Sequence, residues 1–73
     1  PNPGSGLFRV LGDLPPDVVF IRIFGVDGRL VLADKLVPAY TFSLANHSEG
    51  TYLAVFEDQA HQPLKVEELV LQR

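Results

Sequence analysis

Short apolar runs, separated by polar segments or by segments with glycine and proline, make up most of the chain. The runs are rich in β-branched and aromatic side chains, and no stretch of ten or more residues repeats its apolar positions at the helical spacing of about 3.6. This pattern predicts an all-β protein, specifically a small immunoglobulin-like antiparallel β-sandwich of six to seven strands. The expected strands cover residues 7–11, 18–24, 30–37, 40–44, 51–57 and 64–71.

Two connections have the composition of hairpin turns. Asp27 and Gly28 stand directly between two apolar runs, and an Asp-Gly pair favours a type I′ turn with a positive φ at the glycine. We therefore expect a hairpin that closes at Asp27 and Gly28, with Arg29 as an exposed charge just after it. The polar segment 58–63 predicts a second hairpin between the last two strands.

The apolar positions of the last run change parity along its length. Leu64 and Val66 share one face of a regular strand, whereas Leu69 and Leu71 share the other, and Glu67-Glu68 stands at the change. A β-bulge near these two glutamates would reconcile the two halves.

Both faces of the expected sheet carry apolar side chains. If one set points into the core, parity turns a second set outward, and that outer set would be a candidate surface for a partner or would be covered by other parts of the protein. The inward set is Ile21, Ile23, Val31, Tyr52, Ala54 and Phe56, and the outward set is Phe20, Phe24, Leu30, Leu32, Leu53 and Val55 with the charged residues Arg22 and Asp34.

Size and composition narrow the class of protein. At 73 residues the chain is expected to form a single domain, 1–73, and a start on Pro1 suggests a fragment of a longer protein. There is no cysteine, so the core has no disulfide to support it. A net charge of -3, with the six basic residues scattered, argues against nucleic acid as a partner. No apolar run approaches the roughly 18 residues of a membrane helix.

A search for catalytic or ligand-binding chemistry finds little. His47 and His61 stand 14 residues apart in expected surface turns, a spacing that does not suggest a metal site. No serine lies in a nucleophile motif, and we expect no catalytic residue, no metal and no cofactor. Tyr40 and Tyr52 are the two tyrosines that could stack on a sugar.

Three blocks of sequence carry a resemblance to a known family. They are Pro1-Asn2-Pro3 followed by Gly6, then the hairpin with Gly28, Arg29 and Val31, then Gly50 and Tyr52 ahead of an apolar C-terminal run, Leu69, Val70 and Leu71, that ends at Arg73. In order and spacing they resemble the type A C-terminal sorting domain of the type IX secretion system of Bacteroidetes. The match spans essentially the whole chain, although Gly25 and Glu67-Glu68 depart from residues that the family often has there.

The resemblance implies a function that is not enzymatic. Such a domain is a secretion signal: the type IX outer-membrane translocon recognises it in the periplasm and carries it with its N-terminal cargo domain to the cell surface or the medium. A sortase-like peptidase then removes it. The C-terminal strand and the apolar outer face would contact the machinery, by strand addition at a sheet edge. The apolar face or the edge strand could also mediate self-association of the chain.

A second hypothesis stays open beside this one. The chain could be an accessory immunoglobulin-like or fibronectin-like module of an extracellular enzyme, acting as a spacer or binding glycans. For Gly28, Gly50 and Tyr52, maintenance of the fold is an alternative to direct contact with a receptor. Pro1 to Pro3 would form a stiff extended lead-in, because each proline fixes its own φ and Pro3 restricts Asn2.

Overall fold

A computed structural model describes residues 7–9, 14–37 and 40–71. All regular structure in these ranges is β-strand, and the strands pair antiparallel, so the prediction of an all-β antiparallel protein is confirmed. The strands are β1 (Leu7–Arg9), β2 (Phe20–Gly25), β3 (Leu30–Lys35), β4 (Thr41–Ser43), β5 (Gly50–Glu57) and β6 (Pro63–Leu71).

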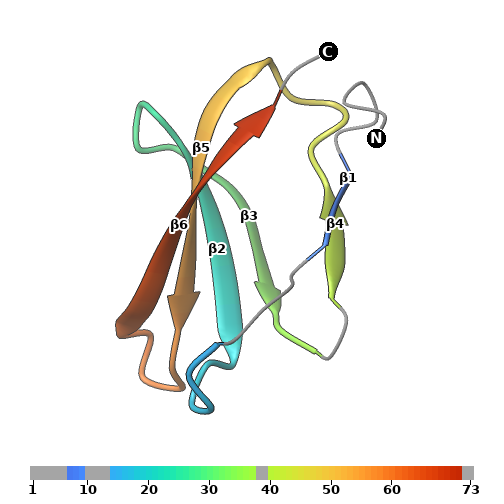
Figure 1. The fold of residues 1–73 in the computed structure, drawn as a ribbon. Helices are drawn as coiled ribbons and strands as arrows, with labels where there is room; N and C mark the ends of the chain where they lie inside the picture. Colours follow the sequence, from blue (N-terminus) through green and yellow to red (C-terminus); the bar gives the residue numbers. More distant parts are fainter. Residues whose placement is uncertain (1–6, 10–13, 38–39, 72–73) are drawn as a thin grey trace.

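Four of the strands form one sheet in the order β3-β2-β5-β6, and β1 pairs with β4 separately. Figure 1 shows the β1–β4 pair across from the four-stranded sheet. The β2–β3 and β5–β6 hairpins close at opposite ends of the larger sheet (Figure 1). The hairpin predicted at Asp27 and Gly28 is therefore present.

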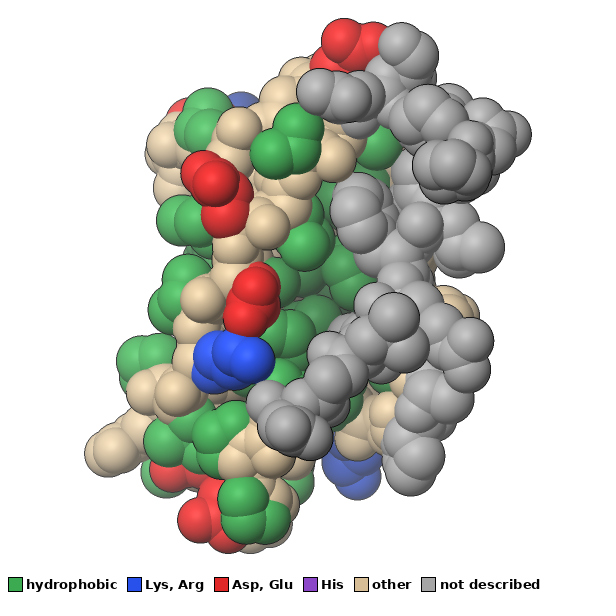
Figure 2. Space-filling model, in the orientation of Figure 1, with side chains coloured by type: hydrophobic (Ala, Val, Ile, Leu, Met, Phe, Trp, Pro, Cys, Tyr) green, Lys and Arg blue, Asp and Glu red, His purple; other side chains and the backbone are tan. Residues whose placement is uncertain are grey.

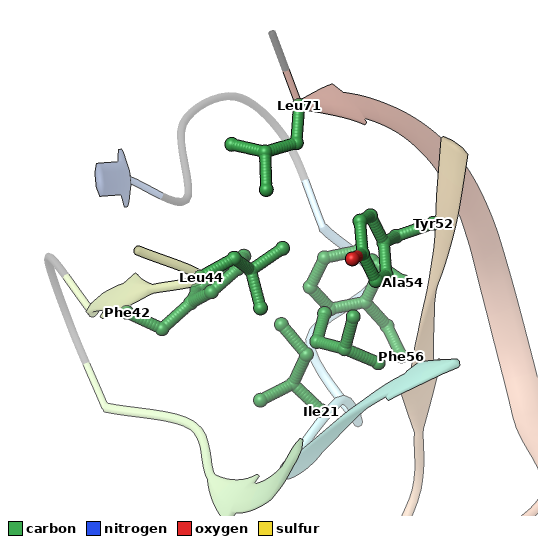
Figure 3. Close-up of a cluster of buried hydrophobic side chains, with 8 residues drawn as sticks. Ile21, Phe42, Leu44, Tyr52, Ala54, Phe56 and Leu71 are labelled. Atoms are coloured by element: carbon green, nitrogen blue, oxygen red, sulfur yellow. The ribbon is translucent and has the colours of Figure 1, made fainter. Parts of the chain in front are cut away.

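The core lies between the four-stranded sheet and β4 with the residues that follow it. Strict alternation along β2 and β5 sends every second side chain inward, as the sequence predicts. Phe42 and Leu44 pack from the opposite side, and Leu71 closes the cluster from the end of β6 (Figure 3). Each large apolar side chain that is fully buried contributes roughly 1.5 to 3 kcal/mol. The buried set is Ile21, Ile23, Phe42, Leu44, Tyr52, Ala54, Phe56 and Leu71.

A bulge in β3 overturns part of the predicted division into two faces. Ile23 pairs with Leu32 and Phe24 with Leu30, so Val31 is the extra residue between them. Past a bulge the parity of a strand reverses. Leu32 therefore packs against the core together with Val31, and Asp34 stands opposite the buried Ile21. The expectation that Leu32 and Asp34 face outward was wrong for this reason.

The predicted bulge at Glu67-Glu68 was also wrong. Pairing between β5 and β6 runs one to one from Lys65 to Leu71, and the irregularity lies at Leu64, between the pairs Phe56–Lys65 and Glu57–Pro63. Lys65 and Glu67 consequently share the core side of β6 with Leu69 and Leu71. This is tolerated because β6 is at the edge of the sheet, where the two charges form an ion pair of 3.1 Å and stay 36% and 49% exposed.

The outer face is defined here as the side of the four-stranded sheet turned away from the core. Along β5 and β6 it presents large apolar side chains to solvent: Leu53 is 39%, Val66 55% and Val70 53% exposed. Figure 2, in the orientation of Figure 1, views the molecule with its two layers side by side and shows an acidic and a basic side chain in contact among hydrophobic ones. The register assigns to the outer face Phe20, Arg22, Phe24, Leu30, Ala33, Lys35, Thr51, Leu53, Val55, Glu57, Val66, Glu68 and Val70.

Candidate recognition site at one end of the sheet

The loop between β2 and β3 consists of residues 26–28, the three enclosed by a backbone hydrogen bond between Gly25 and Arg29. The N–H of Gly28 donates to the carbonyl of Gly25 at 3.0 Å, and the N–H of Gly25 donates to the carbonyl of Arg29 at 2.8 Å. Gly28 has a φ of 84°, whereas Asp27 is not left-handed and instead accepts the Arg29 N–H at its Oδ1, at 3.0 Å. The turn runs from Gly25 to Gly28, and of its residues only Gly28 has a positive φ. The prediction of a type I′ turn was therefore wrong, although the positive φ at Gly28 was right.

The loop between β4 and β5 is held by Tyr52. The ring of Tyr52 is 7% exposed, and its hydroxyl donates to the backbone carbonyl of Ser48 at 2.5 Å. The His47 ring meets the Tyr52 ring edge-on, with centroids 6.4 Å apart. Gly50 ends the loop with a φ of 144°, a conformation that a side chain would strain. Tyr52 therefore fixes the path of the loop from inside the fold.

These two loops enclose a shallow pocket of about 340 Å³. Val26, Asp27 and Arg29 line it from the first loop, residues 46–50 line it from the second, and Val31 and Tyr52 also contribute. Arg29 is exposed, and within the described ranges its guanidinium takes part in no ion pair or side-chain hydrogen bond. The pocket thus has a cation at its rim that is available to a partner.

The C-terminal end of β6 reaches the same end of the sheet. Leu71 pairs with Gly50, Val70 with Thr51 and Leu69 with Tyr52. Leu71 is 2% exposed and belongs to the core, whereas Val70 is 53% exposed on the outer face. Neighbouring residues at the end of this strand therefore have different roles: Leu71 stabilises the fold and Val70 is accessible.

The structure thus brings together most of the residues singled out in the sequence. Segments around positions 28, 50 and 70 meet at one end of the sheet, although about 20 residues separate each from the next. The predicted positions Pro1, Asn2, Pro3, Gly6 and Arg73 lie outside the described residues. The residues brought together are Gly28, Arg29, Val31, Gly50, Tyr52, Leu69, Val70 and Leu71.

Sequence reasoning missed the polar residues that complete the pocket. Asn46, His47 and Ser48 were interpreted only as a turn, and Asp27 only as part of a hairpin signal. Their shared role follows from two loops meeting in space, for which a single sequence carries no signal. The one local hint is the spacing from Ser48 to Tyr52, which lets a buried tyrosine bond to the loop before its own strand.

Neither tyrosine has a fully exposed ring: Tyr40 is half-buried, and its ring stacks on Phe42 with centroids 6.0 Å apart. Tyr52 is buried, and the hydroxyl of Tyr40 donates to Asp34 Oδ2 at 2.8 Å. Burial, this hydrogen bond and the nearby negative charge of Asp34 together raise the pKa of Tyr40 to about 12. The aromatic platform considered for a glycan is therefore absent at Tyr52.

The described ranges contain no group of three or more histidine, aspartate and glutamate side chains placed to hold a metal ion. In the same part of the chain no helix is long and apolar enough to cross a membrane. No significant match was found among protein-family models, curated proteins or solved structures.

Proposed function

We propose that this chain is a non-catalytic C-terminal secretion signal, folded as a small immunoglobulin-like sandwich, that directs its cargo through a type IX outer-membrane translocon. A sortase-like surface peptidase would then remove it. The observation that supports the proposal is the meeting of the resembling segments, around Gly28 and Arg29, Gly50 and Tyr52, and Leu69 to Leu71, at one end of the sheet.

A receptor can read separate segments as one signal only when the fold presents them on one surface. Here the exposed members are Gly28, Arg29 and Val70, and the buried members Tyr52 and Leu71 hold them in place. In this proposal the first group contacts the machinery, and the second maintains the shape of the surface. A rigid surface binds with less loss of conformational entropy than a flexible peptide would.

The edge of β6 provides a second means of contact. β6 pairs with β5 on one side, and among the described residues no strand pairs with its other side. An edge strand of nine residues can accept an added strand through backbone hydrogen bonds, while Val66 and Val70 offer apolar contacts on the outer face. Strand addition at β6 would place the partner next to the pocket.

The test is export of a reporter fused in front of residues 1–73 and delivered to the periplasm of a bacterium with type IX secretion. We expect the reporter at the surface or in the medium, and in the periplasm of a matched strain without the translocon. The Arg29→Gln and Val70→Thr variants should export about tenfold less, since each loses an exposed contact without disturbing the core. Lys65→Gln is the control for charge, because Lys65 pairs with Phe56 toward the other end of the sheet and does not line the pocket.

Point variants are better suited to this test than deletion of the C-terminal strand. Leu71 is 2% exposed, so its removal would destabilise the core and confuse loss of folding with loss of recognition. Circular dichroism of each purified variant establishes that it is folded. A folded wild-type fusion that stays in the periplasm would contradict the proposal and favour the accessory-module alternative.

A further inference from the structure

At the opposite end of the sheet a carboxylate is buried on the outer face. The Glu57 side chain is only 7% exposed, although its strand position turns it away from the core. Its Oε1 lies 3.2 Å from Arg22 Nε and 3.0 Å from His61 Nδ1. A buried carboxylate is stable only when donors compensate its lost hydration, and these two side chains supply them.

His61 holds a position that the hairpin itself does not favour. The loop between β5 and β6 consists of residues 59–61, enclosed by a backbone hydrogen bond between Asp58 and Gln62, and His61 is its last residue. The His61 N–H donates to the carbonyl of Asp58 at 2.9 Å, and its φ is 63°. Glycine adopts this conformation without strain, whereas another residue pays about 1 kcal/mol or more. The His61 ring is fixed by its contact with Glu57 and by stacking on Phe20, with centroids 4.6 Å apart and planes at 19°. Strained positions of this kind are frequent at functional sites.

A hollow of about 270 Å³ lies beside the cluster, and its lining includes Phe20, Arg22, Asp34, Lys35 and His61. The Asp34 carboxylate already accepts from the Tyr40 hydroxyl and from the Lys35 N–H. In the described ranges the Lys35 ammonium group has no ion pair or hydrogen bond. The hollow is therefore lined by two cationic side chains, Arg22 and Lys35, and by one carboxylate whose two oxygens each already accept a hydrogen bond.

The geometry also decides which atoms of Arg22 and His61 are available. Because His61 Nδ1 faces a carboxylate oxygen at 3.0 Å, it carries the proton of that contact. Arg22 Nη2 lies 3.3 Å from the same Nδ1, and a donor cannot bond to a protonated nitrogen. The Nη hydrogens of Arg22 thus lack an acceptor in His61, and the side chain is 36% exposed beside the hollow.

We propose that this hollow binds a small oxyanion group, a phosphate or a carboxylate carried by a ligand, with Arg22 and Lys35 as the direct contacts. Glu57 and His61 are positioning residues: the carboxylate holds the Arg22 guanidinium through Nε and leaves the Nη groups to the ligand. The volume of the hollow, about 270 Å³, is close to the lower end of the range for small-molecule sites, which suits a single phosphate or carboxylate group. The site lies at the far end of the sheet from the recognition site and does not depend on the proposed function.

The test uses the 15N-labelled 73-residue chain, titrated separately with inorganic phosphate, with citrate and with sodium chloride at matched ionic strength. We expect saturable amide shifts confined to residues around 20–22, 33–35 and 60–62, with phosphate or citrate binding at millimolar concentration or tighter. The difference between the phosphate and citrate affinities then assigns the oxyanion class. Sodium chloride should produce smaller shifts that do not saturate.

Two variants separate a binding role from a purely structural one. Lys35→Gln changes an exposed side chain and should weaken anion binding about tenfold, whereas Lys65→Gln, with the same change of charge on β6, should leave binding within about twofold. His61→Gly should also weaken binding, because Glu57, which holds Arg22, loses its contact with His61, while the hairpin keeps a residue suited to the turn. Equal shifts in phosphate and sodium chloride, or full phosphate affinity in both Lys35→Gln and His61→Gly, would overturn the proposal.

Discussion

His61 takes the same position in the β5–β6 hairpin that Gly28 takes in the β2–β3 hairpin. Both are the third residue of a three-residue loop, both donate an N–H to the carbonyl three residues earlier, and their φ values are 63° and 84°. One hairpin therefore uses the residue type that this backbone favours, and the other places an imidazole there. The difference lies in the side-chain contacts: Gly28 has no side chain, whereas the His61 imidazole contacts the Glu57 carboxylate and the Phe20 ring.

The cost of this backbone conformation at His61 can be measured by comparing two substitutions. His61→Gly and His61→Ala both lose the contacts with Glu57 and Phe20, but only alanine keeps the left-handed strain. We expect His61→Gly to be more stable than His61→Ala by about 1 kcal/mol in urea unfolding. Equal stabilities would mean that the hairpin relaxes to another turn.

A similar comparison applies to the first hairpin. Gly28→Ala should lower the unfolding free energy by about 1 kcal/mol through its φ of 84°, because no atom lies within 4 Å of the added Cβ and steric clash plays no part. Gly28→Asn should cost less, since asparagine tolerates the left-handed region better. If both variants were as stable as the wild type, the turn would not depend on a positive φ.

The ion pair between the half-buried Arg22 and the buried Glu57 should show strong coupling in a double-mutant cycle. Arg22→Leu alone leaves the Glu57 carboxylate, 7% exposed, with only its His61 contact among the described residues, and should destabilise the fold by about 1 to 3 kcal/mol. Adding Glu57→Leu removes that uncompensated charge, so the double variant should be more stable than Arg22→Leu alone. Additive free energies in urea unfolding would contradict the coupling.

The hydrogen bond from Tyr52 to Ser48 should control the order of the β4–β5 loop. Tyr52→Phe keeps the buried ring but leaves the Ser48 carbonyl without this donor, at a cost of about 1 kcal/mol. We expect faster amide hydrogen exchange at residues 46–50 in the variant and unchanged exchange in the β5–β6 loop, which serves as the internal control. Unchanged exchange in both loops would show that the hydroxyl does not order the β4–β5 segment.

Alkaline pH should weaken the fold through Tyr40. Its pKa is raised from 10.0 to about 12 in the folded chain, so above pH 10 the unfolded state loses this proton first. Stability from this group is complete below pH 10 and falls as the pH rises through 12. Tyr40→Phe should be less stable at neutral pH but should lose less stability between about pH 8 and pH 11, as measured by urea midpoints. Parallel curves for the two proteins would contradict this.

The local pattern of residues by itself determined the class of the fold, the approximate strands and the inward side of two of them. Alternation assigns Ile21 and Ile23 to one face of β2, and Tyr52, Ala54 and Phe56 to one face of β5, because side chains of an extended strand point alternately to its two sides. The positive φ at Gly28 is likewise a local property of the turn. Each of these features depends on neighbours along the chain alone.

Pairing between strands decided the rest. A bulge at Val31 turned Leu32 and Asp34 inward, and an irregularity at Leu64, instead of at Glu67-Glu68, put Lys65 on the core side of β6. The register of β2 against β5 brings the β2–β3 and β4–β5 loops together in one pocket. The same register brings Glu57 to Arg22, which lies 35 residues away along the chain. Register is set by hydrogen bonds between distant segments, so the sequence alone predicts which residues can face inward, and the tertiary structure decides which of them meet.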